Sequence, residues 1–222
     1  MTERFIRNEM LLGPRAMEKL KSSHVCVVGL GGVGSCAAEA LARSGVGELT
    51  STAGRSKAAV MAERVRDINP DCAVHPLAIH YDRETPDSFF DGLDYIADAI
   101  DLVSCKIDLI CRARDRGIPV LSALGTGNKL DPSRLEVTDL SLTRGCPLAR
   151  VMRRELGRRD IRHLKVVYSS EEAVPCAPLE APPPGRRSVP GSVPWVPPIA
   201  GIMMAGAIVM DLVGEARPYA QD

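Results

Sequence analysis

Residues 24–36 read HVCVVGLGGVGSC, an apolar run that leads directly into a cluster of glycines. Val25, Val27 and Val28 are typical of a buried strand, and the small residues that follow favour a helix lying close on a sheet. The G-x-G-x-x-G spacing of residues 29–34 between such elements brings backbone N–H groups and a helix N-terminus against a phosphate. The sequence therefore predicts a nucleotide-binding turn. The alternative is a glycine turn with a purely structural function.

The composition indicates one globular domain of residues 1–222, with 45% hydrophobic and 25% charged residues and no net charge. The molecule as a whole is therefore not an evident polyanion binder, and any nucleic-acid affinity must come from uneven charge placement. The seven cysteines are scattered and form no C-x-x-C pair, which argues against a disulfide scaffold and against a cysteine-built zinc site. Free thiols fit a reducing compartment, so we expect a cytoplasmic protein without zinc.

Strands and helices alternate through the first half of the chain, which predicts a nucleotide-binding core over residues 24–124. This order implies an α/β fold: a Rossmann-like, mostly parallel sheet with helices on both faces and the ligand at the carboxyl ends of the strands. The expected strands are residues 24–30, 47–50, 72–79, 94–100 and 118–124, and the expected helices 13–22, 34–44, 55–68 and 105–116.

Residues 125–222 form a less regular extension on the substrate side. We expect additional strands at 135–140 and 163–168 and a helix at 147–156. Residues 175–198 contain nine of the 17 prolines, which favours an extended, mobile loop. The apolar run 198–210 is short for a membrane span, so we expect a buried helix and no membrane association.

The chain resembles the ubiquitin-activating-enzyme-like adenylating superfamily. Besides the glycine turn, this resemblance is carried by residues 4–7 (RFIR), 45–50 (GVGELT), 54–57 (GRSK), 68–70 (INP) and 98–101 (DAID). Within the superfamily, the branch of tRNA threonylcarbamoyladenosine dehydratases is the most similar, through residues 123–132 (ALGTGNKLDP), 146–153 (CPLARVMR) and 190–193 (PGSV). The likeness covers roughly residues 4–214. The related activators of sulfur carriers usually have paired C-x-x-C zinc ligands, which this chain lacks.

The resemblance implies that ATP activates a carboxylate, with a tRNA bearing threonylcarbamoyladenosine as the partner. The carboxylate attacks the α-phosphate, and a neighbouring atom of the same side chain then closes a ring and expels AMP. Such chemistry brings two anions together, so the protein must neutralise charge and align the groups. No protein nucleophile is required.

The resemblance also assigns residues to these tasks. Lys57 would reach a phosphate oxygen, Asp101 would hold Mg²⁺, and Arg7 would reach the triphosphate of a partner subunit, which implies a homodimer. Each has a simpler interpretation: a solvated lysine, a helix-capping aspartate and a surface arginine. The expected nucleotide-binding residues are Gly29, Gly31, Gly32, Gly34, Lys57 and Asp98, although Asp98 could equally only end its strand.

Basic residues outnumber acidic ones over residues 144–165. When a basic cluster binds a phosphate backbone, counterions are released, which favours binding. We therefore expect tRNA to bind here. The alternative is a solvated helix face, because no interleaved aromatic residues indicate base stacking. Reversing the charges should weaken tRNA binding and spare ATP binding. The residues concerned are Arg153, Arg154, Arg158 and Arg159.

Two cysteines are candidate nucleophiles. Cys146 precedes a predicted helix start, where thiolates are favoured, and Cys176 lies in the proline-rich segment. Idle cysteines are the commoner case, and the implied reaction requires none.

One expected stretch is absent after Thr50. Members of the superfamily carry there an acidic residue for the ribose, followed by an Asn and an Arg that face the phosphates. This chain passes at once to Gly54, and no Asp or Glu stands between Glu48 and Glu63. Three explanations are open: residues omitted from the sequence, an engineered deletion, or a naturally degenerate relative. A real deletion should lower ATP affinity and turnover severely, and an intact mass near 23.9 kDa would establish it.

Three rival functions remain at this level. The first is adenylation of the C-terminal glycine of a small sulfur-carrier or ubiquitin-like protein. The second is a nicotinamide-dependent oxidoreductase, disfavoured by the missing ribose acid and by Lys57 and Asp101. The third is a non-catalytic nucleotide-binding module.

Overall fold

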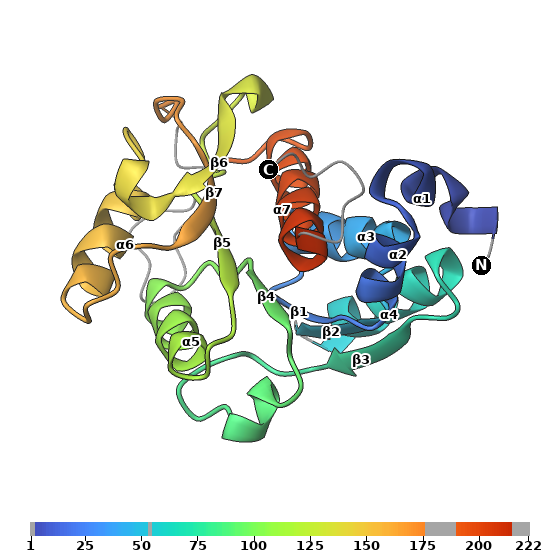
Figure 1. Ribbon diagram of the computed structural model, residues 1–222. Helices are drawn as coiled ribbons and strands as arrows, with labels where there is room; N and C mark the ends of the chain where they lie inside the picture. The colour runs from blue at the N-terminus through green and yellow to red at the C-terminus, as the bar shows by residue number, and fades with distance from the viewer. Residues whose placement is uncertain (1–2, 53–54, 176–189, 215–222) are drawn as a thin grey trace.

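The protein is built around one seven-stranded sheet (Figure 1). The computed structural model describes residues 3–52, 55–175 and 190–214. The strands are β1 (His24–Val28), β2 (Glu48–Thr52), β3 (Ala73–Leu77), β4 (Tyr95–Asp98), β5 (Val120–Leu124), β6 (Leu135–Asp139) and β7 (Lys165–Ser169).

The strand order is β3-β2-β1-β4-β5-β7-β6, and every neighbouring pair is parallel except β6 with β7. The chain moves from β1 outward through β2 to β3 and then returns to place β4 on the other side of β1. This reversal puts a topological switch point at the carboxyl ends of β1 and β4, where open α/β sheets bind ligands. The expected fold class, a mostly parallel Rossmann-like sheet, is confirmed.

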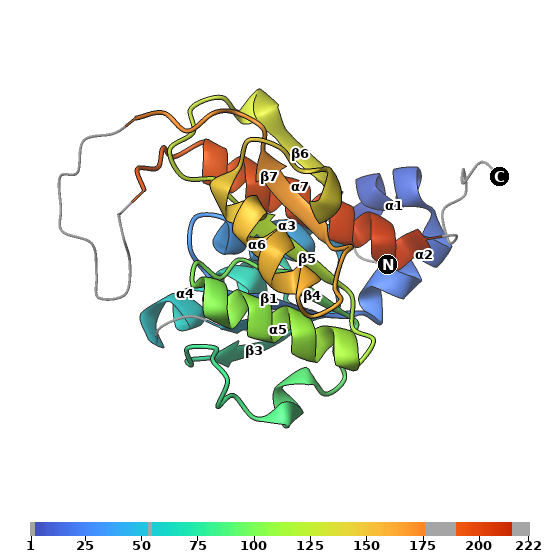
Figure 2. The ribbon, with the colours of Figure 1, turned by 90° about the vertical axis from the view of Figure 1, so that its left-hand side faces the viewer.

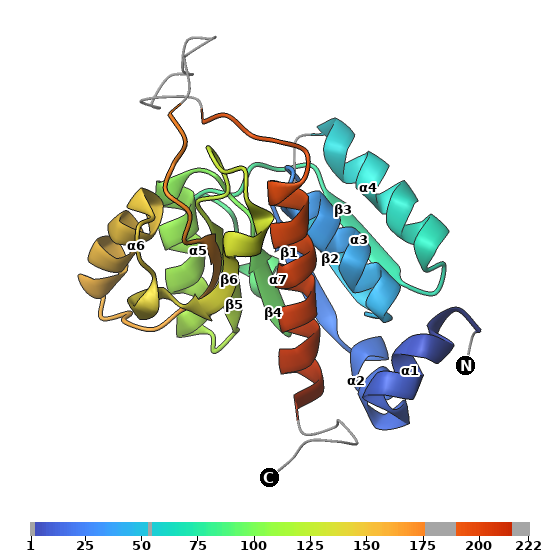
Figure 3. The ribbon, with the colours of Figure 1, turned by 90° about the horizontal axis from the view of Figure 1, so that it is seen from above.

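Helices cover both faces of the sheet, as the alternating pattern predicts (Figure 3). Val25 and Val27 point into one core and Cys26 and Val28 into the other, because side chains alternate along a strand. Figure 2 shows the second face, with α5 and α6 in front of the strands. The first core is covered by α2 (Pro14–Lys21), α3 (Gly34–Ser44), α4 (Arg55–Ile68) and α7 (Val196–Val213), and the second by α5 (Val103–Asp115) and α6 (Pro147–Gly157).

One helix was not expected, and two helices, α5 and α7, begin two residues before their predicted starts. A short helix, α1 (Ile6–Leu12), precedes α2 and was not expected, because it is exposed and has no buried stripe to announce it. The last helix begins at Val196, two residues before the predicted start. Prolines are tolerated in the first turn of a helix, so Pro197 and Pro198 do not delay it. Residues 176–189 of the predicted proline-rich loop lie outside the described residues.

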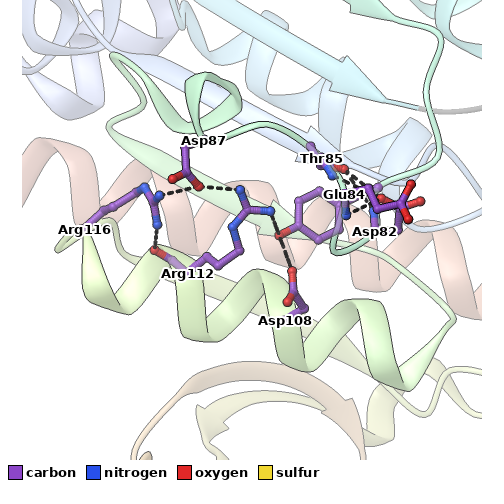
Figure 4. Close-up of polar contacts among 8 residues, drawn as sticks. Asp82, Glu84, Thr85, Asp87, Asp108, Arg112 and Arg116 are labelled. Carbon is purple, nitrogen blue, oxygen red and sulfur yellow. Dashed lines mark hydrogen bonds and ion pairs between the residues drawn. The ribbon is translucent and has the colours of Figure 1, made fainter.

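The connection between β3 and β4 is fastened to α5 by polar contacts (Figure 4). The Tyr81 hydroxyl donates to Asp108 at 2.9 Å, and Arg112 and Arg116 each approach the Asp87 carboxylate at 2.6 Å. Hydrogen bonding from Arg112 lowers the pKa of Asp87 below its usual value. Both guanidinium groups also stack within 5 Å of the Phe90 ring centroid. This connection is thereby held against the second core.

Asn128 joins the two segments that flank residues 176–189. Its backbone carbonyl accepts from Val174 N–H at 2.8 Å, and its side-chain oxygen accepts from Gly191 N–H at 2.6 Å. Its own N–H donates to the carbonyl of Gly191 at 2.7 Å. The residue has a φ of 56°, a left-handed conformation that asparagine tolerates better than most residues. The segment that follows β7 and the segment that leads to α7 are thus both tied to Asn128.

Helix α7 packs directly on α3 behind the glycine turn. A Cβ at Gly201 would lie 2.2 Å from the carbonyl oxygen of Val33, so only glycine permits this approach. Among the described residues, α7 is the one helix long and apolar enough to cross a membrane by composition, and 44% of its 18-residue window is buried inside the protein. Seven of its apolar residues are buried in the first core, whereas Ile202 and Met210 are exposed.

We expect Gly201→Ala to destabilise the protein by about 1–3 kcal/mol, because the added methyl must push α7 away from α3. Thermal or denaturant unfolding measures the effect. Gly206→Ala in the same helix is the matched control: its Cβ would meet no atom within 4 Å, so it should raise stability by up to about 1 kcal/mol. Equal effects of the two changes would contradict the close contact.

Candidate functional site

The glycine turn after β1 is held by two contacts that exclude side chains. Gly29 has a φ of +93°, and a Cβ there would lie 2.6 Å from the Ala99 carbonyl oxygen. A Cβ at Gly34 would lie 1.8 Å from the carbonyl oxygen of Gly29. These two glycines let the start of α3 fold back against the end of β1 and the segment after β4. Contacts within the protein's own backbone therefore require glycine at both positions.

Gly31 differs from these two, because a Cβ there would meet no protein atom within 4 Å. Its carbonyl oxygen accepts from the Ser35 hydroxyl at 2.7 Å, which fixes the turn. The initial N–H groups of a helix require partners. At the start of α3 the Ser35 N–H donates to the Gly31 carbonyl at 3.1 Å, and no side chain caps the helix. An open space beside an uncapped helix start is a place where an anion can reach backbone N–H groups. Gly32, the remaining predicted glycine, faces Pro197 of α7 instead.

A pocket of about 320 Å³ lies between this turn and α4, lined by Leu30, Ser35, Lys57, Val60 and Met61. Leu30 belongs to the turn and Ser35 to α3. Lys57 enters from the first part of α4, and its side chain is exposed. The structure therefore brings Lys57 and the glycine turn to one depression, which combines a cation with an uncapped helix start.

The end of β4 carries the two predicted aspartates, and the structure separates their surroundings. The Asp98 side chain is fully buried. It lies 2.7 Å from the Lys106 Nζ atom and accepts from the Ser122 hydroxyl at 2.7 Å. Asp98 thus lies under the turn and not on its surface. Asp101 is exposed and follows Ala99, whose carbonyl borders Gly29, by two residues.

Lys106 and Ser122, the two partners of the Asp98 carboxylate, were not predicted from the sequence. Lys106 is only 1% exposed on α5, and Ser122 is buried on β5. A lysine at a position of α5 flanked by the buried Ile107, Leu109 and Ile110 was the available signal, since a lysine is almost never fully buried without a partner.

Arg7 lies at the other end of α3 from the glycine turn. It is exposed on α1, and the neighbouring Asn8 donates to the carbonyl of Arg43, near the last residue of α3, at 2.9 Å. The glycine turn precedes the first residue of α3. Arg7 and Lys57 are therefore not brought together within one chain.

The predicted basic surface lies on α6, and its four arginines have different surroundings. Ala149, Met152 and Leu156 of α6 are buried. Arg153 donates to the carbonyl of Thr143 at 2.8 Å and is partly buried, so it holds the segment before α6. The other three arginines surround Glu155, at 3.0 Å from Arg154, 3.1 Å from Arg158 and 3.5 Å from Arg159.

The charge of this arginine group is only partly neutralised. Hydrogen bonding from Arg154 holds the pKa of Glu155 below its usual value, so that one carboxylate is charged among three guanidinium groups. Helix α6 begins beside Gly125, which directly follows β5, because a Cβ at Gly125 would lie 2.4 Å from the Cys146 sulfur. Helix α6 therefore starts at the edge of the sheet that carries the glycine turn, but the arginine group lies at its other end, where Arg114 in the last turn of α5 donates to the Arg159 carbonyl at 3.1 Å.

Cys146 has a structural role at the start of α6. It is buried, and its sulfur accepts from the N–H of Ala149 at 3.5 Å, which caps α6. Cys176 lies outside the described residues. Within residues 3–52, 55–175 and 190–214, no three His, Cys, Asp or Glu side chains gather to hold a metal ion.

The connection after β2 is short. The strand runs to Thr52 and α4 begins at Arg55, so two residues join them. The ribose-binding acid expected after this strand has no counterpart in the sequence. Among the described residues at the end of β2, Ser51 has a buried hydroxyl without a hydrogen-bond partner.

The fold agrees with solved structures. The crystal structure of Escherichia coli tRNA N6-threonylcarbamoyladenosine dehydratase in complex with AMP matches with a TM-score of 0.84 and 31% identity, covering 96% of each chain. A crystal structure of the same enzyme in complex with ATP matches with a TM-score of 0.82 and 32% identity, covering 96% of this chain and 95% of that one.

Sequence comparison gives the same result. The tRNA threonylcarbamoyladenosine dehydratase of Bacillus subtilis is 39% identical over 245 residues, covering 97% of this chain and 96% of the relative. An alignment longer than the 222 residues of this chain must contain gaps in it. The model of the ThiF family matches in two segments, residues 5–52 and 50–219, which overlap at the end of β2. Together these segments span almost the entire sequence, and the chain belongs to the ThiF family.

Proposed function

We propose that this chain is an ATP-dependent tRNA threonylcarbamoyladenosine dehydratase. The observation that carries the proposal is the open glycine turn at the uncapped start of α3, which shares its pocket with Lys57. The relatives named for this activity match over nearly the whole chain. Two of the solved structures contain AMP or ATP, which supports ATP as the nucleotide.

The proposed reaction has two steps. A carboxylate oxygen of the threonylcarbamoyl group attacks the α-phosphorus of ATP, and pyrophosphate leaves. A neighbouring atom of the same side chain then attacks the activated carbonyl carbon, a ring closes, and AMP leaves. The net change in the nucleoside is the loss of one water. The protein contributes alignment and positive charge, because both reacting groups of the first step are anions.

Lys57 and the N–H groups at the start of α3 would hold the phosphates. Asp101 would hold Mg²⁺, which is commonly bound by one or two carboxylates together with substrate phosphates. When bound, the ion would neutralise charge on the phosphates. An exposed aspartate at the carboxyl end of a parallel strand, beside the glycine turn, fits that donor set.

A homodimer would complete the site. Arg7 lies at the end of α3 opposite the glycine turn, so it would act on the nucleotide of a partner subunit. Helix α1 also exposes three large apolar side chains, Ile6, Met10 and Leu11, which a second copy of the chain would cover. A tRNA substrate further implies a cytoplasmic protein, and no membrane association is part of the proposal.

Incubation with ATP, Mg²⁺ and tRNA bearing threonylcarbamoyladenosine tests the activity. We expect the modified nucleoside to lose the mass of one water, and Lys57→Ala to lower the rate by about 10²-fold or more. ATP should be raised to millimolar concentrations, because no acidic residue stands between Glu48 and Glu63 to bind the ribose. An unchanged nucleoside under these conditions would refute the proposal. Pyrophosphate exchange dependent on a small carrier protein would favour the alternative carboxylate.

Gly31→Ala tests the nucleotide turn itself. The methyl group meets no protein atom, so the variant should unfold at the same temperature as the unaltered chain. It would occupy the space beside the helix start, and we expect the Kd for ATP to rise about tenfold or more. Gly34→Ala should instead lower thermal stability, because its methyl collides with the Gly29 carbonyl. ATP binding unaffected by Gly31→Ala would place the nucleotide elsewhere.

The arginine group of α6 is the proposed tRNA surface. Reversing Arg154, Arg158 and Arg159 to glutamate should weaken tRNA binding by about tenfold or more at moderate salt and flatten its salt dependence. ATP binding should be unchanged. Arg153 is left intact because it holds the segment before α6.

The control for this experiment makes the same charge change on α2, at Arg15, Lys19 and Lys21, which are exposed. Filter binding or fluorescence anisotropy measures both variants. An equal loss of affinity in the two variants would show that net charge, and not α6, governs tRNA binding.

A further inference from the structure

A buried cluster connects α5 and β5 to the end of β4, directly beneath the glycine turn. It consists of Asp98, Lys106 and Ser122, which are all 1% exposed or less. The Lys106 Nζ atom lies 2.7 Å from Asp98 and donates to the Ser122 oxygen at 3.0 Å. The Ser122 hydroxyl in turn donates to Asp98 at 2.7 Å. One carboxylate oxygen, Oδ2, receives both donors.

The other carboxylate oxygen holds the backbone of the following turn. Asp98 Oδ1 accepts from the N–H of Ile100 at 3.1 Å. Between these two residues, Ala99 donates its N–H to the carbonyl of Val28 at 2.9 Å. A Cβ on Gly29 would lie only 2.6 Å from the carbonyl oxygen of Ala99. The segment from Asp98 to Ile100 therefore touches the glycine turn on one side and leads to Asp101 on the other.

We infer that Lys106 is a positioning residue for the nucleotide site. By fixing the orientation of the Asp98 carboxylate, it holds the N–H of Ile100 and so sets the path of the chain from Ala99 to Asp101. Its effect on nucleotide and Mg²⁺ binding rests on the proposed function. Its effect on the path of the chain from Ala99 to Asp101 does not depend on that function.

The chemistry of the cluster favours this role over a purely stabilising one. Two charges taken out of water lose hydration that their mutual attraction only partly returns, so a buried ion pair contributes little net stability compared with apolar side chains of similar size. Removal of one partner, by contrast, leaves a buried charge without compensation. Here the pair imposes one orientation on a carboxylate whose second oxygen is used by the backbone.

Lys106→Met tests the inference, because it keeps the length of the side chain and removes the charge. We expect the Kd for ATP and the Mg²⁺ concentration at half-saturation each to rise about tenfold. We also expect amide hydrogen exchange of Ile100 to accelerate at least tenfold, while Ile96 in the middle of β4 keeps its protection. The exchange measurement requires no nucleotide.

Tyr95→Phe is the matched control on the same strand. It deletes the hydrogen bond from the Tyr95 hydroxyl to Asp211, 2.7 Å in length, at the amino end of β4. It should lower thermal stability without changing the exchange of Ile100 or the Mg²⁺ requirement by more than about twofold. Equal changes in the two variants would assign the effect to general destabilisation and overturn the inference.

Ser122→Ala is the milder variant, and it decides the matter if Lys106→Met does not fold. It removes one donor to Asp98, so Ile100 exchange and the Mg²⁺ requirement should each rise about threefold, roughly the effect of one hydrogen bond. A folded Lys106→Met, or failing that a Ser122→Ala, with unaltered exchange at Ile100 would refute the positioning role. If the unaltered chain binds no ATP, the proposed function fails, and Ile100 exchange still tests Lys106.

Discussion

The whole site depends on one steric constraint, the contact between the start of α3 and the backbone of the preceding strand. Gly34 and Gly29 meet so closely that no side chain fits between them. This contact turns the chain sharply and aims the first turn of α3 toward the edge of the sheet. The nucleotide site proposed above depends on that direction, with Lys57 supplied by α4 and Asp101 by the segment after β4.

Two neighbouring aspartates in the same region have opposite surroundings. Asp98 and Asp101 differ by three residues, yet one is enclosed with Lys106 and Ser122 and the other lies at the surface. Burial makes the first an internal support, and exposure leaves the second accessible to a ligand.

The fold class and nearly all elements could be predicted because each core element has a recognisable apolar pattern within its own segment of the sequence. Strand β1 is a continuous apolar run, and α4 repeats apolar residues at helical spacing with Asn69-Pro70 at its end. The exposed α1 has no such pattern and was missed. The role of Lys106 could not be predicted for a different reason: its partners come from other elements, and only the folded sheet brings Asp98 and Ser122 to it. The structural role of Arg153 could not be predicted either, because its contacts with Thr143 depend on the path of a loop.

Helix α7 has a consequence for how the protein is made. Its glycine at position 201 packs on the Val33 carbonyl, and Pro197 contacts the position of Gly32, so the back of the nucleotide turn is completed by the last helix described. A ribosome releases residues 24–36 long before residues 196–213. During synthesis the strands β1 to β5 can assemble early, whereas the apolar back of α3 stays uncovered until α7 emerges. The nascent protein thus has an interval in which this surface is open to aggregation or to chaperones.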